Sequence, residues 1–158
     1  MRSKEEKKRE KRKEMEIVET SKGKPLVLYK GYQFRQYRCN GEVITWLCLN
    51  EKTSRCKGRM ATRNGEILKF IEHTCKPDLA KCEVKKHVAI ARKRAKEEVL
   101  PIAQIYKEEV GQLVNRGYEF ITNVPTYSSV KSSLYRLRRG KRDEDESNDS
   151  KRIVLTKE

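Results

Sequence analysis

The stretch WLCLNEKTSRCKGRMATRNGEILKFIEHTC, residues 46–75, decides the fold of this 158-residue chain. It spaces three cysteines and one histidine at unequal intervals: Cys48, Cys56, His73 and Cys75. Three thiolates and one imidazole form a complete tetrahedral ligand set for Zn²⁺, and they leave no coordination position for a substrate water. We therefore predict one zinc ion, held by these four residues, with a purely structural role.

An Asn-Gly pair within this stretch predicts how the ligands meet. Asn-Gly between two strand-like runs favours a two-residue type I′ turn, because both central residues need a positive φ. With Asn64-Gly65 as the turn, uninterrupted antiparallel pairing places Met60 opposite Lys69. The same register places Cys56 opposite His73, with Cβ atoms about 5 Å apart, so that both side chains can reach one ion.

Two other spacings complete the predicted ligand geometry. His73 and Cys75 are two residues apart, so on an extended strand they share one face. Cys48 comes from the end of a preceding hairpin, whose turn is indicated by a second Asn-Gly pair, Asn40-Gly41. The four ligands are therefore expected to converge, provided that no β-bulge interrupts the pairing.

The alternative to a metal site is a set of buried thiols or disulfides. Five cysteines is an odd number and no apolar signal segment opens the chain, so an oxidising compartment is not expected. Cys39 and Cys82 lie outside the ligand pattern and are predicted to be ordinary thiols, although either is a candidate to replace Cys75. His87 lies among basic residues and is predicted to be a solvated helix histidine.

The residues on both sides of the first hairpin carry a resemblance to a known family. The segment Leu28-Tyr29-Lys30-Gly31-Tyr32-Gln33-Phe34, then Trp46-x-Cys48, Cys56 and a terminal His73-x-Cys75, closely resembles the FLYWCH-type zinc finger. The resemblance covers Pro25 to Pro77. The family usually ends in His-x-His, but the related WRKY-like fingers accept His-x-Cys, and thiolate is an equally good zinc ligand. The resemblance implies a small zinc-pinned antiparallel sheet, binding of DNA or protein, and frequent ties to DNA transposons.

The composition independently favours a polyanionic partner. The formal net charge is +15, with 38 Lys and Arg against 23 Asp and Glu. Neutralising DNA phosphates releases counterions, which gives binding that weakens steeply with salt. Charge alone is equally consistent with a solvated surface. Together with a zinc-pinned sheet, however, the charge favours double-stranded DNA as the partner. The sequence has no apolar run able to span a bilayer, so no membrane partner is expected.

The predicted fold class is small α+β, a zinc-stabilised antiparallel sheet followed by a helical region, with disordered termini. The zinc finger is assigned to residues 25–78 and the helical region to 79–140, where apolar residues recur at helical spacing. Residues 1–24 are predicted to be a charged tail, disordered or partly helical, and residues 141–158 an acidic disordered tail. The helices are expected to form a small bundle or a linker with an exposed basic face or, alternatively, a helix-turn-helix.

Residues 82–142 are also similar, more loosely, to the segment that follows this finger in Mutator-like transposases. That similarity implies a DNA-recognition region of transposon descent. The catalytic part of those enzymes needs three carboxylates that hold two metal ions, and a chain of this length has no room for it. Transposase activity is therefore not expected.

The resemblance also suggests which residues contact DNA. In the WRKY-like fold, one N-terminal strand enters the major groove, and the matching stretch here is Lys30–Arg38. Arginine and glutamine can bind base edges, whereas lysine more often binds phosphate. The predicted contacts are Lys30, Gln33, Arg35 and Arg38, with Lys57 and Arg59 as further phosphate contacts. The alternative is that these are merely exposed strand residues.

These observations predict a zinc-dependent, sequence-selective DNA-binding protein of the nucleus, either a transcriptional regulator or a transposon-derived recognition factor. The alternative is a protein–protein interaction module that uses the sheet and the helices. An enzyme is not expected, because the metal has no open position and no Ser/His/Asp or paired-carboxylate arrangement is recognisable. No catalytic residue and no small-molecule substrate are predicted.

Overall fold

The computed structural model describes the backbone of residues 15–155 and the side chains of residues 15–141. The predicted tail residues 1–14 and 156–158 lie outside the described residues. The chain divides into two compact units, here called the sheet unit, which ends at Lys85, and the helical unit, which begins at Lys86. Within residues 15–155, no helix has both the length and the apolar character needed to cross a bilayer.

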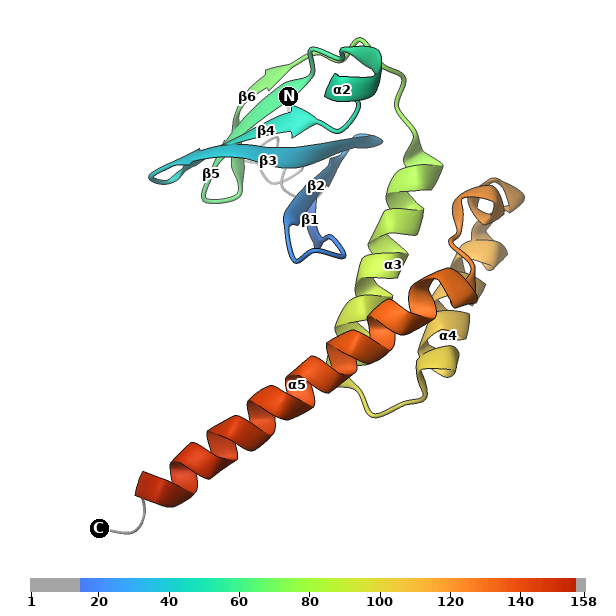
Figure 1. The fold of residues 1–158 in the computed structure, drawn as a ribbon. Coiled ribbons are helices and arrows are strands. Elements are labelled where there is room, and N and C mark those ends of the chain that lie inside the picture. Colours follow the sequence, from blue (N-terminus) through green and yellow to red (C-terminus); the bar gives the residue numbers. More distant parts are fainter. Residues whose placement is uncertain (1–14, 156–158) are drawn as a thin grey trace, which may run out of the picture. The chain divides into compact units, whose positions relative to one another are not determined.

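The sheet unit is built on a single antiparallel sheet of six strands in sequence order, which curls along its length (Figure 1). A one-turn helix, α2, connects the fourth and fifth strands, and the sheet is followed by helices, so the predicted fold class is confirmed. The elements are β1 Met15–Glu19, β2 Pro25–Tyr29, β3 Tyr32–Asn40, β4 Val43–Cys48, α2 Glu51–Ser54, β5 Arg59–Arg63 and β6 Glu66–Ile71.

The first strand corrects the prediction of disorder or partial helix for residues 15–24. Strand β1 pairs with β2 along its whole length, from Met15 opposite Tyr29 to Glu19 opposite Pro25. Its Val18 packs against a small cluster of Leu26, Leu28 and Cys82. Val18 is partly buried on that face, and Met15 packs against the aromatic core. The charged residues around these two positions hide the strand in the sequence.

The core of the sheet unit is small and aromatic. Val27, Tyr29, Phe34, Trp46 and Met60 are buried together. The Trp46 indole N–H donates a 2.8 Å hydrogen bond to the buried Thr62 hydroxyl, which satisfies the polar end of this large side chain. A core of this size is too small to hold a domain together securely without another source of stability.

The turn of the β5–β6 hairpin is as predicted, but its register is not. Asn64 and Gly65 have φ values of 50° and 77°, as a type I′ turn requires, so that prediction is confirmed. A β-bulge then interrupts the pairing beyond Thr62, and Met60 lies opposite Phe70 rather than Lys69. The predicted pairing of Cys56 with His73 is therefore wrong, and both residues lie outside the strands.

The bulge has a clear physical cause. Ile67 and Phe70 both pack against the aromatic core, although they are three residues apart. In an uninterrupted strand, residues three apart project from opposite faces, so one extra residue is needed between them. The bulge supplies that residue and leaves Leu68 exposed.

The β3–β4 hairpin turns one residue later than the Asn-Gly pair predicts. Asn40 pairs with Val43, so the two loop residues are Gly41 and Glu42. Gly41 has φ 56° while Asn40 remains in the strand. Glycine in the first loop position is the preference of a type II′ turn, which also suits a two-residue hairpin.

The helices lie where the apolar spacing predicts them. They are α3 Leu79–Glu97, α4 Ile102–Arg116, the 3₁₀ helix η1 Tyr118–Asn123 and α5 Tyr127–Leu155 (Figure 1). Ala95, Ile102, Val130 and Leu134 form the buried core of the helical unit. The ten residues between α4 and α5 are too many for the short turn of a helix-turn-helix, so the bundle alternative holds.

Two predictions about the helical region are wrong. Helix α5 continues to Leu155, where an acidic disordered tail was expected from residue 141. The sequence from Lys141 to Leu155 contains no glycine or proline to end the helix. His87 is buried rather than solvated, because its Nδ1 lies 2.9 Å from the carboxylate of the equally buried Glu109.

Candidate metal centre

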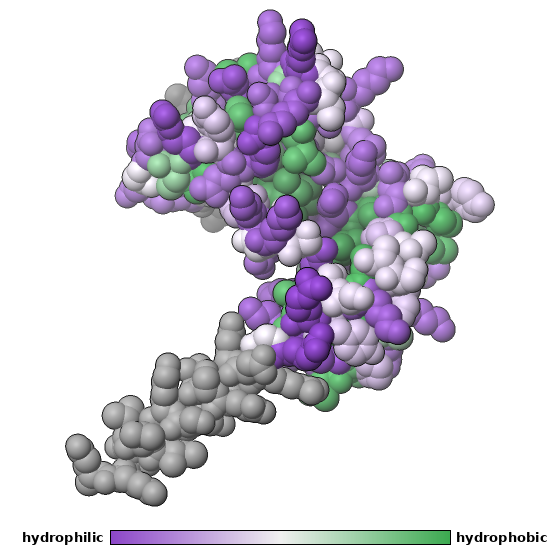
Figure 2. Space-filling view, viewed as in Figure 1, coloured by the Kyte–Doolittle hydropathy of each residue, from purple (hydrophilic) through white to green (hydrophobic). Residues whose placement is uncertain are grey.

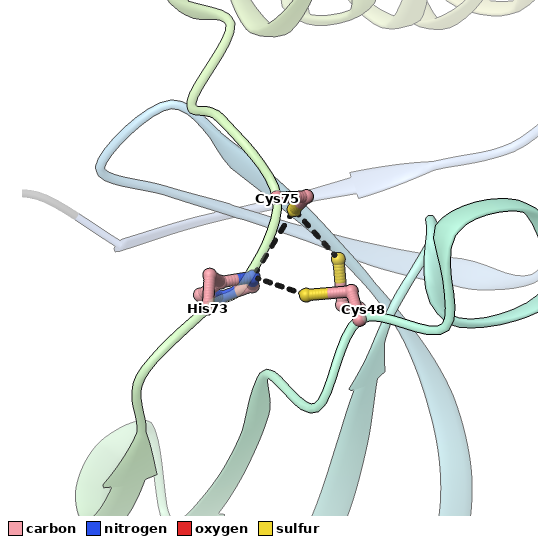
Figure 3. Close-up of side chains that lie close together, drawn as sticks. Cys48, His73 and Cys75 are labelled. Atoms are coloured by element: carbon pink, nitrogen blue, oxygen red, sulfur yellow. Dashed lines mark hydrogen bonds between the residues drawn. The ribbon is translucent and has the colours of Figure 1, made fainter.

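The four predicted ligands come from three separate pieces of the sheet unit. Cys48 is the last residue of β4, and Cys56 lies in the loop between α2 and β5. His73 and Cys75 follow the end of β6. Figure 3 shows the side chains of Cys48, His73 and Cys75 pointing toward one another. All four ligand atoms lie within 4.8 Å of one another, so the structure brings the whole predicted set together.

The distances among the ligand atoms fit a tetrahedral zinc ion. Zn–S and Zn–N bonds of about 2.3 and 2.0 Å give tetrahedral edges of about 3.8 Å between sulfurs and about 3.5 Å between sulfur and nitrogen. The Sγ atoms of Cys48 and Cys75 are 3.7 Å apart. His73 Nδ1 lies 3.4 Å from Cys56 Sγ and 3.6 Å from Cys75 Sγ. The donor set therefore has the size and the chemistry of a closed structural zinc site.

The loop between Cys48 and Cys56 is shaped by its own backbone. Helix α2 makes one turn, and Arg55 then adopts a left-handed conformation with φ 52°. The Cys48 N–H donates a 3.0 Å hydrogen bond to the Gly58 carbonyl. The seven intervening residues thus form a closed loop that returns Cys56 to the end of β4, which replaces the cross-strand pairing that the sequence suggested.

The imidazole of His73 is held among aromatic rings. The Tyr32 ring stacks on it with centroids 3.6 Å apart and an interplanar angle of 7°. The Phe34 ring meets it edge-on at 5.0 Å. This cage orients Nδ1 toward the thiols, while Nε2 is buried without a hydrogen-bond partner among the described residues. The aromatic residues of the family motif therefore position the histidine ligand, a role that the sequence reasoning did not assign.

Gly58 is a second supporting residue that the sequence reasoning missed. A Cβ atom at this position would lie 2.3–2.7 Å from three atoms of the His73 ring, closer than real contacts allow. The Gly58 N–H also donates to Cys56 Sγ at 3.4 Å. Only glycine lets the histidine ring lie against the backbone here. In the sequence, the pattern Cys56-x-Gly58 is the feature that could have indicated this role, because it places a glycine two residues after a ligand.

Comparison with known proteins agrees with this geometry. Residues 17–74 match the model of the FLYWCH zinc finger domain family. This segment of the chain is therefore similar to FLYWCH zinc finger domains. It is similar to FLYWCH-type zinc finger-containing protein 1 of Mus musculus and of Homo sapiens, each 28% identical over 69 residues. The match covers 44% of this chain and 10% of each relative, so the chain spans only a small part of the relatives' length.

The FLYWCH domain and its three-cysteine, one-histidine cluster together fit one structural zinc ion. A structural zinc site contributes folding energy directly and offers no open position for a reaction. Zinc fingers of this kind are binding domains for nucleic acid or protein. The matched segment begins at residue 17, inside β1, which agrees with the inclusion of that strand in the sheet.

The surroundings of the three-cysteine, one-histidine cluster shift the pKa values of two thiols in opposite directions. Burial raises the pKa of Cys48 to about 12. Burial also opposes ionisation of Cys56, but the backbone N–H groups of Gly58, Cys75 and Thr74 outweigh it and lower the pKa of Cys56 to about 5. Because zinc binds thiolates, metal binding here displaces a proton from Cys48.

The strand register places several cations on one face of the FLYWCH sheet, opposite the aromatic core. Arg35 and Arg59 both lie opposite Leu47, Arg38 lies opposite Thr45, and Arg63 lies opposite Val43. Directly opposed residues project from the same face, and the three β4 partners alternate with core residues. Lys69 joins them opposite Ala61. We call Arg35, Arg38, Arg59, Arg63 and Lys69 the basic face.

The six predicted DNA contacts divide between this face and other positions. Arg35, Arg38 and Arg59 lie on the basic face, which also contains the unpredicted Arg63 and Lys69. Arg38 and Arg59 are exposed, whereas Arg35 is half-buried in a 2.8 Å ion pair with Glu51.

The other three predicted contacts are not on this face. Gln33 is only 9% exposed, and its side chain hydrogen-bonds the Cys82 thiol, so it is unavailable to DNA. Lys30 is exposed in the β2–β3 turn, with its ammonium 5.4 Å from the centroid of the Tyr29 ring. Lys57 is exposed just before β5 and lines an open hollow together with Arg55 and Arg59. Lys57 therefore borders the basic face.

Proposed function

We propose that this chain is a nuclear protein whose FLYWCH domain binds double-stranded DNA through the basic face and selects its target sequence. The observation that carries the proposal is the strand register, which gathers five cations from three strands on one face of a zinc-pinned sheet. The resemblance of the motif to DNA-binding fingers supports it. A catalytic role is not proposed.

The charge of the basic face is only partly balanced by neighbouring acids. Glu51 pairs closely with Arg35, and Glu42 lies 4.0 Å from Arg63. Arg38, Arg59 and Lys69 have no carboxylate within salt-bridge distance among the described side chains. The view in Figure 2 shows a mostly hydrophilic surface over the sheet unit. Such a patch attracts polyanions and speeds their association.

The kind of side chain on this face suits base recognition as well as phosphate binding. Four of its five cations are arginines, whose guanidinium can donate two parallel hydrogen bonds to guanine in the major groove. Arg35 is already oriented by its ion pair with Glu51. Lys69 and the neighbouring Lys57 suit the phosphate backbone. The zinc site supports this role by fixing the ends of β4 and β6, which hold the cations in register.

Selection of bound sequences from a random duplex library, with the full chain, tests the proposal. We expect enrichment of a defined site by the zinc-loaded protein, and loss of that enrichment when Arg38 and Arg63 are both replaced by glutamine. A matched control, Lys22→Gln with Lys24→Gln, removes the same charge from the exposed β1–β2 turn and should keep the site. Absence of enrichment by the unmodified chain would refute sequence-selective recognition.

A second candidate function is docking of partner proteins on the sheet unit. The observation that favours it is the exposure of large apolar side chains, with Tyr37 at 59%, Ile17 at 58% and Leu68 at 53%. Binding that is insensitive to salt and is lost on Tyr37→Ser would support this function over DNA binding. The looser similarity to transposase segments leads us to propose descent from a DNA transposon for either function.

A further inference from the structure

The first half of helix α5 has an unusual charge composition. No aspartate or glutamate occurs from Tyr127 to Arg142, whereas lysine or arginine occupies positions 131, 136, 138, 139, 141 and 142. The apolar residues of this segment pack in the core of the helical unit. That packing gives no role to most of these cations. They belong to the helical unit and are separate in sequence from the FLYWCH domain.

The inner side of this helix is firmly anchored within the helical unit. Val130 and Leu134 are buried in one cluster with Ala95 and Ile102. The Arg138 guanidinium donates hydrogen bonds to the carbonyls of Ala95 and Leu100, at 3.0 and 2.7 Å. Arg138 thus binds one carbonyl in the last turn of α3 and one in the linker that follows it, where the helix leaves carbonyl groups without intrahelical partners. The helix therefore presents a fixed outer side.

The outer side carries a row of cations around an exposed tyrosine. Lys131, Tyr135 and Arg139 follow at steps of four residues and so form one stripe, with Arg136 beside it. All four are exposed, Tyr135 by 43%. Ser128 and Ser132 lie next to them at helical spacing and add small hydroxyl donors. We call Lys131, Tyr135, Arg136 and Arg139 the α5 stripe.

The acids of the neighbouring helices do not neutralise this stripe. Arg94 of α3 binds Glu98, Glu108 and Glu109, at 2.7, 2.7 and 3.0 Å. Glu109 also accepts from His87 in the buried pair. No carboxylate among the described side chains lies within salt-bridge distance of Lys131, Arg136 or Arg139. In the helical unit, these three glutamates are therefore paired with Arg94 and His87, whereas the outer side of α5 from residue 127 to residue 141, the part of that helix whose side chains are described, carries cations and no acid.

We propose that the α5 stripe is a second nucleic-acid surface, which binds the phosphate backbone of duplex DNA. Its outermost cations, Lys131 and Arg139, are eight residues apart, or about 12 Å along the helix at 1.5 Å per residue, enough to reach successive phosphates. Serine and tyrosine hydroxyls are common additional donors to phosphate oxygens. Because phosphate contacts carry no sequence information, the stripe would add affinity while leaving the choice of sequence elsewhere.

The test compares two full-length variants that lose the same charge. The first, K131Q/R136Q/R139Q, removes the cations of the stripe. The control, K93Q/K96Q/K107Q, removes three exposed lysines from α3 and α4 of the same unit. Affinity for mixed-sequence duplex DNA is measured over a salt series, and helical circular dichroism verifies that each variant is folded.

The stripe variant should lose at least tenfold in affinity, and its salt slope should fall by about 2–3, at roughly 0.9 per phosphate contact. The control should change affinity less than threefold. Equal losses of affinity in the two variants would show only an effect of overall charge and would overturn the proposal. Unchanged affinity in both variants would overturn it as well.

A second arm separates this inference from the proposed function of the FLYWCH domain. In an R38Q/R63Q background, salt-dependent DNA binding should persist and should fall further with the stripe variant. A photo-crosslinking amino acid in place of Tyr135 should crosslink to DNA, whereas one in place of Lys107 should not. If the sheet variants have no effect but the stripe variant does, the finger proposal fails and the stripe stands. Absence of a crosslink at 135 would refute the stripe.

Discussion

The sheet unit and the helical unit are stabilised by different means. The sheet unit has a core of five buried apolar residues and a cluster of four metal ligands at its end. The helical unit has no such cluster among its described residues, and its helices are held by apolar packing and by the buried His87–Glu109 pair. The sheet unit should therefore depend on its metal for folding, whereas the helical unit should not, so that loss of zinc should affect the sheet unit alone.

Separate probes report on the two units. The chain has a single tryptophan, Trp46, which is 2% exposed in the core of the sheet unit. Helical circular dichroism comes mainly from α3, α4 and α5. Trp46 fluorescence therefore follows the sheet unit, and the helical signal follows the helical unit.

Removal of zinc should produce the largest difference between the two units. A strong chelator, or Cys56→Ser, should unfold the sheet unit, because structural zinc contributes on the order of 10 kcal/mol to the folding of small fingers. Trp46 fluorescence should shift to the red while most of the helical signal remains. Cys39→Ser, at an exposed thiol outside the cluster, is the control. Unchanged Trp46 emission after complete removal of metal would contradict a structural zinc.

Glu109→Ala should produce the converse effect in the helical unit. It leaves the buried His87 without its partner and removes one acceptor from Arg94. Loss of a partner from a buried hydrogen bond costs about 1–3 kcal/mol. The thermal midpoint of the helical signal should fall, with zinc binding unchanged. Glu108→Ala is a matched control at an exposed partner of the same arginine, and an equal loss there would mean that burial of the pair does not matter.

Gly58→Ala should weaken the metal site without removing a ligand. The added methyl group would overlap the His73 ring and force it away from the thiols. We expect zinc affinity to fall roughly 100-fold, equivalent to about 2.7 kcal/mol. Gly111→Ala in α4 meets open space and should stabilise the helical unit by about 0.5–1 kcal/mol. Competition with a chromophoric chelator measures the first effect, and wild-type affinity in G58A would refute the proposed clash.

Thr62→Val should have the smallest effect on the sheet unit. It keeps the shape of the side chain but leaves the buried Trp46 N–H without its acceptor. The expected loss is about 1–2 kcal/mol, measured as a lower urea midpoint of Trp46 fluorescence in the zinc-loaded protein. Thr45→Val, on the opposite face, should change stability by less than about 0.5 kcal/mol. If the two valine variants have the same urea midpoint, the indole hydrogen bond contributes nothing to the stability of the sheet unit.

Much of the metal site could be predicted because it depends on local chemistry. The identity of the donor atoms follows from residue type, and the Asn64-Gly65 turn follows from its need for positive φ. The bulge in β6 could not be predicted in the same way. It depends on whether Ile67 and Phe70 both pack on the aromatic core, which is a property of the folded sheet. The ligands converge nevertheless, because the loop after β4 returns Cys56 to the site independently of the register.

The remaining errors also concern distant partners. Strand β1 exists because β2 offers it a complete set of backbone partners, and its own charged sequence gives little sign of that. His87 is buried because Glu109, 22 residues later, supplies a hydrogen-bond partner for its ring nitrogen. Local sequence predicts solvation for such a histidine, since burial is favourable only when the partner is present.

The aromatic cage around His73 determines which ligand exchanges this finger can tolerate. Zinc itself accepts four thiolates as readily as three thiolates and an imidazole. Yet cysteine at position 73 would leave a ring-sized void beside Tyr32, whereas position 75 is half-exposed. Variation in ligand type should therefore be confined to the final position of the motif, which is where this chain departs from the family's usual histidine.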